Sequence, residues 1–512
     1  MRKVLLLAIF LLIGTSSYAQ TWVNDTKTLF DKNQAVVLTI NVRTFAAVDN
    51  NRNGIIEPSK GEVKGNFVNA ISRLDEISSL GINTLHLLPI NTVGVKRAYG
   101  TAGSLFAVKN ITEIDPMLKS SNSISGTNFE VKNFVDACHK RNIRVIVEMP
   151  AYGAYDLYLK KSRWFLKNNN RTAVLLPNQK DIRVFNAGTN SNLNKEVYDI
   201  YEKYIDMLLS LNIDGVVVQD PFLKPTKFWQ NLIRHANERN QQFVFIAEMK
   251  QSTKRLPVKG ILFVSLKKLL SVGFDVYLGD FNKFQSLKTG KDFNKNLSKS
   301  LKYTIKKENA KAVLADFAMY NDVAPILVED IYLSKMIIWL SSTLPVNSIY
   351  TDGFQTGDDY SFDLANVKAP KSYTDDKFFF ANRGKMDLYN FSRRPKGSYP
   401  ELQSELKAGN KFKAYIANYM PYAELEILKT VYPDVFAYAL TDRINKMTVF
   451  VLGSFDLENI KNVELEIPKM TKKTVIENVH SYAIPQASRG KFSTLLAPAD
   501  IQVFLVKDFA LK

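Results

Sequence analysis

One short segment carries oxygen-bearing side chains at the spacing of a calcium loop. Acidic or amide residues alternate from position 49 to position 53, and Gly54 permits the sharp turn that such a loop makes. Calcium prefers carboxylate, amide and carbonyl oxygens, so the pattern predicts a Ca²⁺ site. The candidate ligands are Asp49, Asn51, Asn53, Ile55 (through its carbonyl), Glu57 and Glu62. The alternative is an Asx-rich turn held by its own hydrogen bonds.

The elements around this loop predict an α/β fold. Eight short apolar runs alternate with amphipathic stretches, as expected for parallel strands that are buried on both faces and joined by helices. This order predicts a (β/α)8 TIM barrel, and the alternative, an open doubly wound sheet, lacks its glycine-rich loop after the first strand. The runs are 36–42, 84–88, 144–148, 215–219, 243–248, 274–278, 312–317 and 348–351. The helical patterns include 67–80, 128–141, 194–211 and 227–240.

Two stretches depart from the alternation. The segment after the third run has no strong helical pattern and predicts a short excursion domain. Near the C-terminus, the runs 448–452, 463–467, 473–476 and 501–506 are spaced by turns and predict an all-β sandwich. The predicted organisation is signal peptide 1–19, barrel 20–150, excursion 151–192, barrel 193–409 and C-terminal β-sandwich 410–512.

The N-terminus has the pattern of a secretory signal. Arg2 and Lys3 precede the apolar stretch 4–13, and Ser17 and Ala19 are the small residues expected before a cleavage site. The apolar stretch is too short to span a bilayer, and no later segment reaches that length. We therefore expect a periplasmic or secreted protein cleaved near Ala19.

Composition excludes several classes of protein. The chain has 512 residues, of which 46% are hydrophobic, which indicates a globular protein with a large core. The single cysteine, Cys138, rules out an intrachain disulfide and a cysteine-based zinc or iron–sulfur site. The formal charge of +18 comes from scattered lysines without a basic block, so a solvated surface is favoured over a nucleic-acid partner.

Several local matches resemble glycoside hydrolase family 13, the α-amylase superfamily. Segment 81–90 is similar to that family's second strand, and segment 134–147 is similar to its following helix and third strand. Segment 213–215 resembles the start of the nucleophile strand, and segment 245–248 resembles the acid/base strand. The resemblance covers most of the chain after the signal peptide. It implies a TIM barrel that binds or hydrolyses α-glucans.

At the positions that the resemblance makes catalytic, this chain mostly has other residue types than that family. The chemistry needs a nucleophilic carboxylate and a protonated carboxylic acid on either side of the glycosidic bond. The resemblance places Glu248 at the acid/base position, Gln219 at the nucleophile, Val217 at an arginine and Asn321 at a third carboxylate. The third-strand motif, which begins at Glu148, lacks the family's Asn and His. A neutral amide forms no glycosyl ester, so we expect an inactive or impaired enzyme.

A rival interpretation keeps catalysis. Gln219 is followed by Asp220, and Asn321 is followed by Asp322. A one-residue bulge at each strand end would let these aspartates replace the lost carboxylates beside Glu248. Against it, side chains alternate between faces, so a shift of one residue turns the carboxylate out of the barrel mouth.

Aromatic residues near the predicted strand ends are candidates for stacking on sugar. They are Tyr152, Phe222, Tyr320, Phe354 and Tyr360. The alternative for each is ordinary packing, because aromatic side chains dominate cores.

The sequence thus predicts an exported, α-amylase-like pseudoenzyme that binds α-glucan or a related glycan, or acts as a scaffold. Two alternatives stay open. One is a retaining α-glycosidase that uses Asp220 and Asp322 with Glu248. The other is a module that binds a protein partner without glycan contact.

Overall fold

The computed structural model describes most of the chain after the signal segment. The described residues are 22–48, 50, 58–97, 104–120, 124–176, 181–250, 252–256, 261–304, 310–317, 319–321, 324–325, 331–357 and 401–511. The predicted signal peptide, Asp322, Tyr360 and most of the predicted calcium loop lie outside these ranges.

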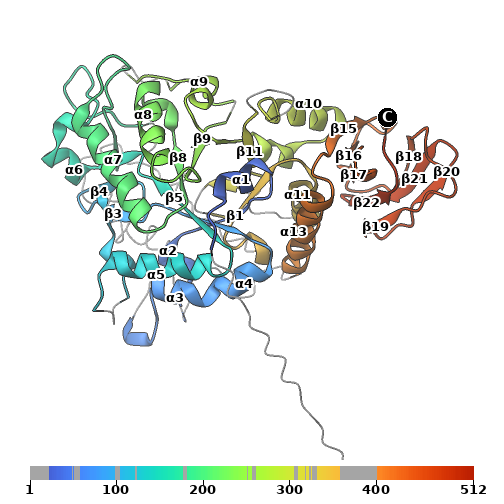
Figure 1. Ribbon diagram of the computed structural model, residues 1–512, viewed down its shortest axis with the longest axis horizontal. Helices are drawn as coiled ribbons and strands as arrows, with labels where there is room; N and C mark the ends of the chain where they lie inside the picture. The colour runs from blue at the N-terminus through green and yellow to red at the C-terminus, as the bar shows by residue number, and fades with distance from the viewer. Residues whose placement is uncertain are drawn as a thin grey trace, which may run out of the picture.

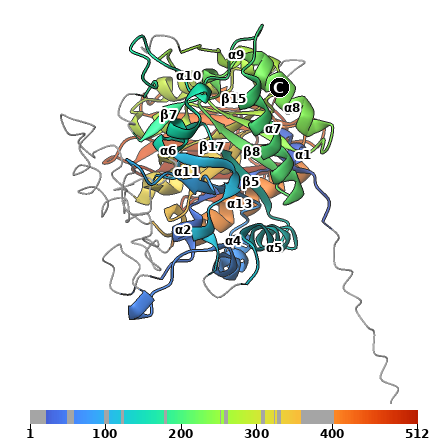
Figure 2. The ribbon, with the colours of Figure 1, turned by 90° about the vertical axis from the view of Figure 1, so that its left-hand side faces the viewer.

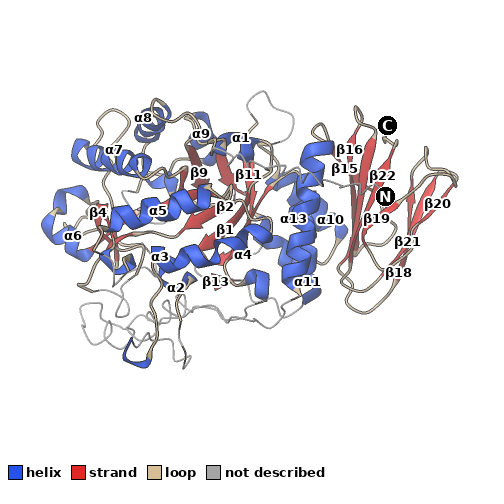
Figure 3. Ribbon diagram, turned by 60° about the horizontal axis from the view of Figure 1, so that its bottom comes forward, coloured by secondary structure: helices blue, strands red, loops and turns tan. Residues whose placement is uncertain are grey.

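Eight parallel strands close into a barrel, as the alternating pattern predicted. Each strand pairs with its neighbours in sequence order, and the last strand returns to the first through the register pair Val36 and Ser348. Figure 3 shows these strands enclosed by helices. The barrel strands are β1 (Val36–Ile40), β2 (Thr84–Leu87), β5 (Arg144–Met149), β8 (Gly215–Gln219), β9 (Val244–Glu248), β10 (Val276–Leu278), β11 (Ala312–Ala315) and β14 (Asn347–Thr351).

Helices cover the outside of the barrel (Figure 1). The single helix predicted over 67–80 is interrupted: Asn66 caps α3 with its side chain, and a short 3-10 segment separates α3 from α4. None of the helices in the described ranges is both long and apolar enough to span a membrane. The helices of the barrel region are α1 (Thr26–Asp31), α2 (Val42–Phe45), α3 (Phe67–Ala70), α4 (Leu74–Ser79), α5 (Thr127–His139), α6 (Tyr155–Lys160), α7 (Lys195–Ser210), α8 (Thr226–Asn237), α9 (Leu266–Ser271), α10 (Gly290–Ser300), α11 (Ile331–Thr343) and α13 (Leu402–Tyr419).

Alternate strand residues separate two apolar layers. The even-numbered residues Val216 and Val218 of β8 pack outward with the helices, whereas Val217 points into the barrel. The same alternation along the other strands fills the barrel interior with side chains. The interior layer includes Val37, Ile146, Val217, Ile246, Val276, Leu278, Leu314 and Ile349.

The excursion is larger in sequence than predicted. Its four-stranded sheet joins β3 (Asn91–Val93) and β4 (Val108–Ile114) to β6 (Tyr152–Ala154) and β7 (Ile182–Val184). Two of the four strands therefore come from between the second and third barrel strands, and the segment 151–192 holds the other two. Figure 2 is viewed from the end away from the C-terminal sheets and shows α6 and β7 in front of β5 and β8.

The C-terminal region forms two packed β sheets around their own core. The first contains β15 (Glu424–Leu428), β16 (Val435–Asp442), β17 (Met447–Ser454), β22 (Ile501–Lys507) and β19 (Glu477–His480). The second contains β18 (Lys461–Glu466), β21 (Lys491–Leu496) and β20 (Gln486–Ser488).

Two sequence predictions in this region are wrong in position. The run 473–476 is no strand, because a hydrogen-bonded turn joins Thr474 N to Thr471 O, and the strand begins only at Glu477. The predicted boundary at residue 410 falls inside α13, an unbroken helix that packs on α11.

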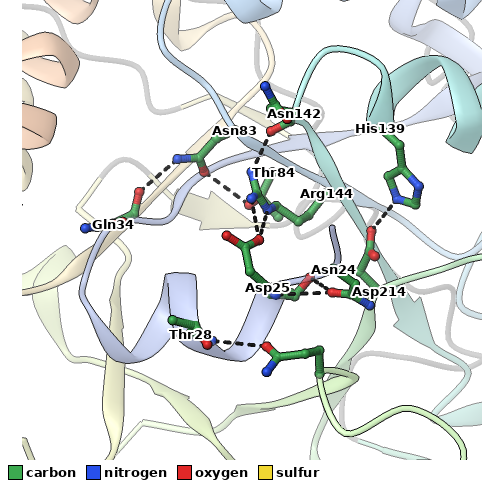
Figure 4. A network of polar contacts seen from close by, with 12 residues as sticks. Asn24, Asp25, Thr28, Gln34, Asn83, Thr84, His139, Asn142, Arg144 and Asp214 are labelled. Carbon is green, nitrogen blue, oxygen red and sulfur yellow. Dashed lines mark hydrogen bonds and ion pairs between the residues drawn. The ribbon is translucent and has the colours of Figure 1, made fainter. Parts of the chain in front are cut away.

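The first described residues lie across the amino-terminal end of the barrel (Figure 4). The Trp22 ring stacks on His139 at 4.0 Å and 6°, and the Arg144 guanidinium lies 5.0 Å from the Trp22 ring centre. Arg144 also forms an ion pair with Asp25. His139 in turn contacts Asp214 at 2.9 Å, so the N-terminal segment is tied to β5 and to the residue before β8.

Replacing Trp22 with alanine is expected to destabilise the fold. The substitution removes a stacked ring pair and a cation–π contact, together worth about 1–2 kcal/mol of unfolding free energy. Urea unfolding of Trp22→Ala measures the loss. Val23→Ala is the matched control, because Val23 is largely exposed and its truncation should leave the unfolding midpoint unchanged.

Candidate active site

Polar side chains line the carboxyl ends of the barrel strands on their inner face. At the carboxyl end of each strand, a polar residue within the strand or up to two residues after it lies beyond the interior apolar layer, because strand side chains alternate. This end of a barrel is where TIM-barrel enzymes place their chemistry. The eight residues are Thr39, His86, Glu148, Gln219, Glu248, Asp280, Asp316 and Thr351.

Gln219 and Glu248 lie side by side at the ends of β8 and β9. They are register partners in the parallel pair, and both are half-buried. Parallel neighbours are about 4.8 Å apart, so the amide and the carboxyl group are next to each other at the mouth. Val217 lies one layer below within the apolar interior and supplies no cation to this pair.

Asp316 adds a buried carboxylate that is not among the site residues predicted from sequence. It directly follows β11, and its Oδ2 lies 2.5 Å from Lys250 Nζ. Its Oδ1 accepts a hydrogen bond from Phe281 N at 2.9 Å. Burial raises the pKa of Asp316, while the Lys250 ammonium opposes that rise. The sequence did contain a feature that could have identified Asp316 as a site residue, because it is the one charged residue inside the apolar run 312–317.

A chain of buried polar contacts joins the adjacent strands β1, β2 and β5 at the mouth. His86 Nδ1 lies 3.1 Å from Thr39 Oγ1, and His86 Nε2 lies 3.0 Å from Glu148 Oε2. Burial lowers the pKa of His86 to about 3, so the imidazole is neutral at physiological pH. The neutral ring accepts from the Thr39 hydroxyl at Nδ1 and donates to Glu148 from Nε2. This arrangement orients Glu148.

Solved α-amylase structures share this architecture over nearly the whole chain. A noncanonic maltogenic α-amylase from Thermotoga neapolitana aligns with a TM-score of 0.66 and 16% identity, covering 94% of this chain and 99% of that chain. An α-amylase from Lactobacillus plantarum aligns with a TM-score of 0.63 and 16% identity, covering 93% and 99%. The chain has the α-amylase fold. The predicted resemblance is confirmed at the level of the fold.

Sequence relatives of this α-amylase-fold chain match it over a shorter region. An α-1,4-glucan:maltose-1-phosphate maltosyltransferase from Bifidobacterium animalis subsp. lactis is 24% identical over 218 residues, which cover 36% of this chain and 27% of the relative. The chain thus spans about a quarter of the length of this relative. No protein-family model matches the chain.

Within the α-amylase fold, Asp220 leaves the extended path of β8. Its backbone is left-handed, with φ 45° and ψ 50°, and its carboxylate accepts a hydrogen bond from the Tyr152 hydroxyl. Burial raises the pKa of Asp220, and the Tyr152 hydrogen bond and Lys224 oppose the rise. Burial also lowers the pKa of Lys224 to about 7. The register of β8 and β9 is continuous through Gln219, and Asp220 directly precedes the 3-10 segment Pro221–Leu223.

Asn321, predicted at the third carboxylate position, lies beyond the end of β11. Its strand β12 (Met319–Asn321) pairs with β13 (Ala324–Pro325) in a separate two-stranded sheet. The carboxylate at the end of the seventh barrel strand is therefore Asp316, and the assignment of Asn321 stays a prediction.

The predicted stacking aromatics are mostly packed in the interior. Tyr152, Phe222 and Phe354 are almost fully buried. The Phe222 ring lies 5.2 Å from Phe263, and the Phe354 ring lies 5.2 Å from Tyr350. Contact between these three rings and a sugar would require neighbouring groups to move. The side chain of Tyr320 lies outside the described part of the structure.

The predicted calcium loop is described only at its edges. Glu62 is buried, and its Oε1 accepts a hydrogen bond from Asn50 N at 3.0 Å, which closes the ends of the loop. Asp49, Asn51, Asn53, Ile55 and Glu57 lie outside the described ranges. Among the residues that are described, no group of three or more His, Cys, Asp or Glu side chains could hold a metal ion.

Proposed function

We propose that this protein is an exported α-glucan-binding protein of the α-amylase fold that does not hydrolyse its ligand. The observation that carries the proposal is the register pair of Gln219 and Glu248, in which an amide is the direct neighbour of the mouth carboxyl group. Retaining hydrolysis requires a second carboxyl group about 5–5.5 Å from the first. The Gln219 amide cannot become the covalent nucleophile.

The pairing of Lys250 with Asp316 supports the same conclusion. An ammonium 2.5 Å from the seventh-strand carboxylate neutralises a charge that would otherwise be available to a substrate. Gln219 and Glu248 are nevertheless half-buried at the mouth, and their hydrogen-bonding groups suit the hydroxyls of a sugar. The two solved structures described above are named as α-amylases, and the sequence relative is named as an α-1,4-glucan:maltose-1-phosphate maltosyltransferase, which favours an α-glucan as the ligand.

Calorimetric titration with maltoheptaose tests binding separately from turnover. Wild-type protein is expected to bind saturably while the sugar stays intact by chromatography. Gln219→Ala should weaken binding by about 3–10-fold, because one hydrogen bond to a sugar is worth about 0.5–1.5 kcal/mol. Absence of saturable binding would contradict the proposal and leave a protein-partner or scaffold role as the better account.

A second candidate function has one specific observation in its favour. Asp220 adopts a left-handed backbone, which is uncommon for residues other than glycine although asparagine and aspartate adopt it more often than most, and such conformations cluster at active sites. An active α-glycosidase that uses Asp220 with Glu248 would account for it. Loss of turnover in both Asp220→Asn and Glu248→Gln would establish this function.

We also propose that the loop from Asp49 to Glu57, closed by Glu62, binds Ca²⁺. Calcium that binds only the folded state raises the melting temperature by linkage. We expect added Ca²⁺ to raise the melting temperature of chelator-treated protein, and Mg²⁺ to do so less. An unchanged melting curve would show that the loop is an Asx-rich turn.

A further inference from the structure

Two neighbouring cavities lie at the amino-terminal end of the barrel, opposite the mouth. The first has a volume of about 450 Å³ and the second a volume of about 420 Å³. Both are bordered by Gln34, Lys413, Ala417 and Asn418. Because they share one face of α13, they form a continuous groove between this helix and the segments that precede β1, β2 and β14. We call it the α13 groove.

Lys413 lies at the centre of the α13 groove. Its side chain is 4% exposed, and its Nζ donates to the carbonyl oxygens of Ser341 at 2.9 Å and Val346 at 2.5 Å. No carboxylate in the described ranges pairs with it, and burial lowers its pKa to about 7. In its protonated form Lys413 has three donors, so these two carbonyls leave one N–H for a ligand. A buried cation without a counter-charge is costly, and an anion would relieve that cost.

The rest of the groove adds positive charge and a free acceptor. Lys32, Lys407 and Lys411 line it, against the single carboxylate of Asp31. Asn410 is buried, and its Nδ2 donates to Leu80 O at 2.8 Å, whereas its Oδ1 has no hydrogen-bond partner in the described part of the chain. The groove thus offers cations to an oxyanion and an amide oxygen to a hydroxyl.

We propose that the α13 groove binds the phosphate or sulfate group of a small hydroxylated molecule, such as a sugar phosphate. Lysine binds phosphate as a point charge, and Lys413 holds that charge in a fixed position. Cavities of this size hold small-molecule ligands, so there is room for more than the oxyanion itself. The site lies at the opposite end of the barrel from Glu248 and does not depend on the function of the mouth.

Titration of the full-length protein with glucose 6-phosphate tests this site. We expect saturable binding with a dissociation constant in the range of about 10 µM to 1 mM, none with glucose, and competition by sulfate at constant ionic strength. Lys413→Met, which keeps the length of the side chain, should weaken binding at least about tenfold. Lys407→Gln combined with Lys411→Gln should weaken it about 3–10-fold.

Lys472→Gln is the matched control, because Lys472 is exposed in the C-terminal domain. This variant should bind glucose 6-phosphate as tightly as the wild type does. Circular dichroism checks the fold of each variant. If Lys413→Met does not fold, the double variant Lys407→Gln/Lys411→Gln tests the proposal. It should fold, because both lysines are exposed. The proposal is overturned if the wild type binds no glucose 6-phosphate, or if the folded variants bind it as the wild type does.

Discussion

Purified wild-type protein is expected to release no reducing sugar from starch or maltooligosaccharides. Loss of the covalent nucleophile in such mechanisms costs on the order of 10⁴–10⁶ in rate. Gln219 occupies the mouth position beside Glu248. Gln219→Asp alone should restore little activity, because Val217 supplies no cation to keep the new carboxylate ionised and Lys250 already pairs with Asp316.

The control for this experiment is Glu248→Gln. If the wild type has turnover that Glu248→Gln abolishes, the protein is an enzyme and the non-hydrolytic proposal fails. A parallel loss in Asp220→Asn would then identify Asp220 as the second carboxylate. Activity that survives both substitutions would indicate a contaminating amylase and would leave the proposal standing.

Replacing Lys250 with methionine is expected to destabilise the barrel strongly at neutral and alkaline pH. The substitution leaves the Asp316 carboxylate buried without its counter-charge, which costs about 3 kcal/mol of unfolding free energy. The double variant Lys250→Met/Asp316→Asn should recover most of the loss, because an asparagine oxygen still accepts from Phe281 N. Lys254→Met is the matched control, since Lys254 is exposed in the same loop.

The destabilisation should shrink as the pH falls. Burial raises the pKa of Asp316 in the folded protein, and removal of Lys250 raises it further. A raised folded-state pKa favours the folded protein at low pH and penalises it once the carboxyl group ionises. Urea unfolding at pH 8 and pH 5 measures the difference. An equal loss at both pH values, or a double variant as unstable as Lys250→Met, would contradict this account of the pair.

The order of elements and the place of the mouth could be predicted from sequence. Parallel barrel strands are buried on both faces, so they appear as short apolar runs, and run 215–219 matches β8 residue for residue. The adjacency of Gln219 and Glu248 follows as well, because consecutive parallel strands are neighbours in a barrel. Turns were harder to predict: the C-terminal run 473–476 has a strand-like pattern, but a hydrogen-bonded turn joins Thr474 N to Thr471 O and the strand begins only at Glu477.

Tertiary structure alone decided which distant residues share an environment. The chain separates Lys250 from Asp316 by 66 positions, and no local pattern relates them until barrel closure brings their strand ends to one mouth. The Asp220 carboxylate likewise meets the Tyr152 hydroxyl of the excursion only in the folded chain. Lys413 has an ordinary position in a helical pattern, and its burial arises only when α13 covers the amino-terminal end of the barrel. The periodicity of apolar residues in the sequence indicates which face of a helix or strand is buried. Charge pairing and cavity formation instead depend on contacts between elements that are far apart in the chain.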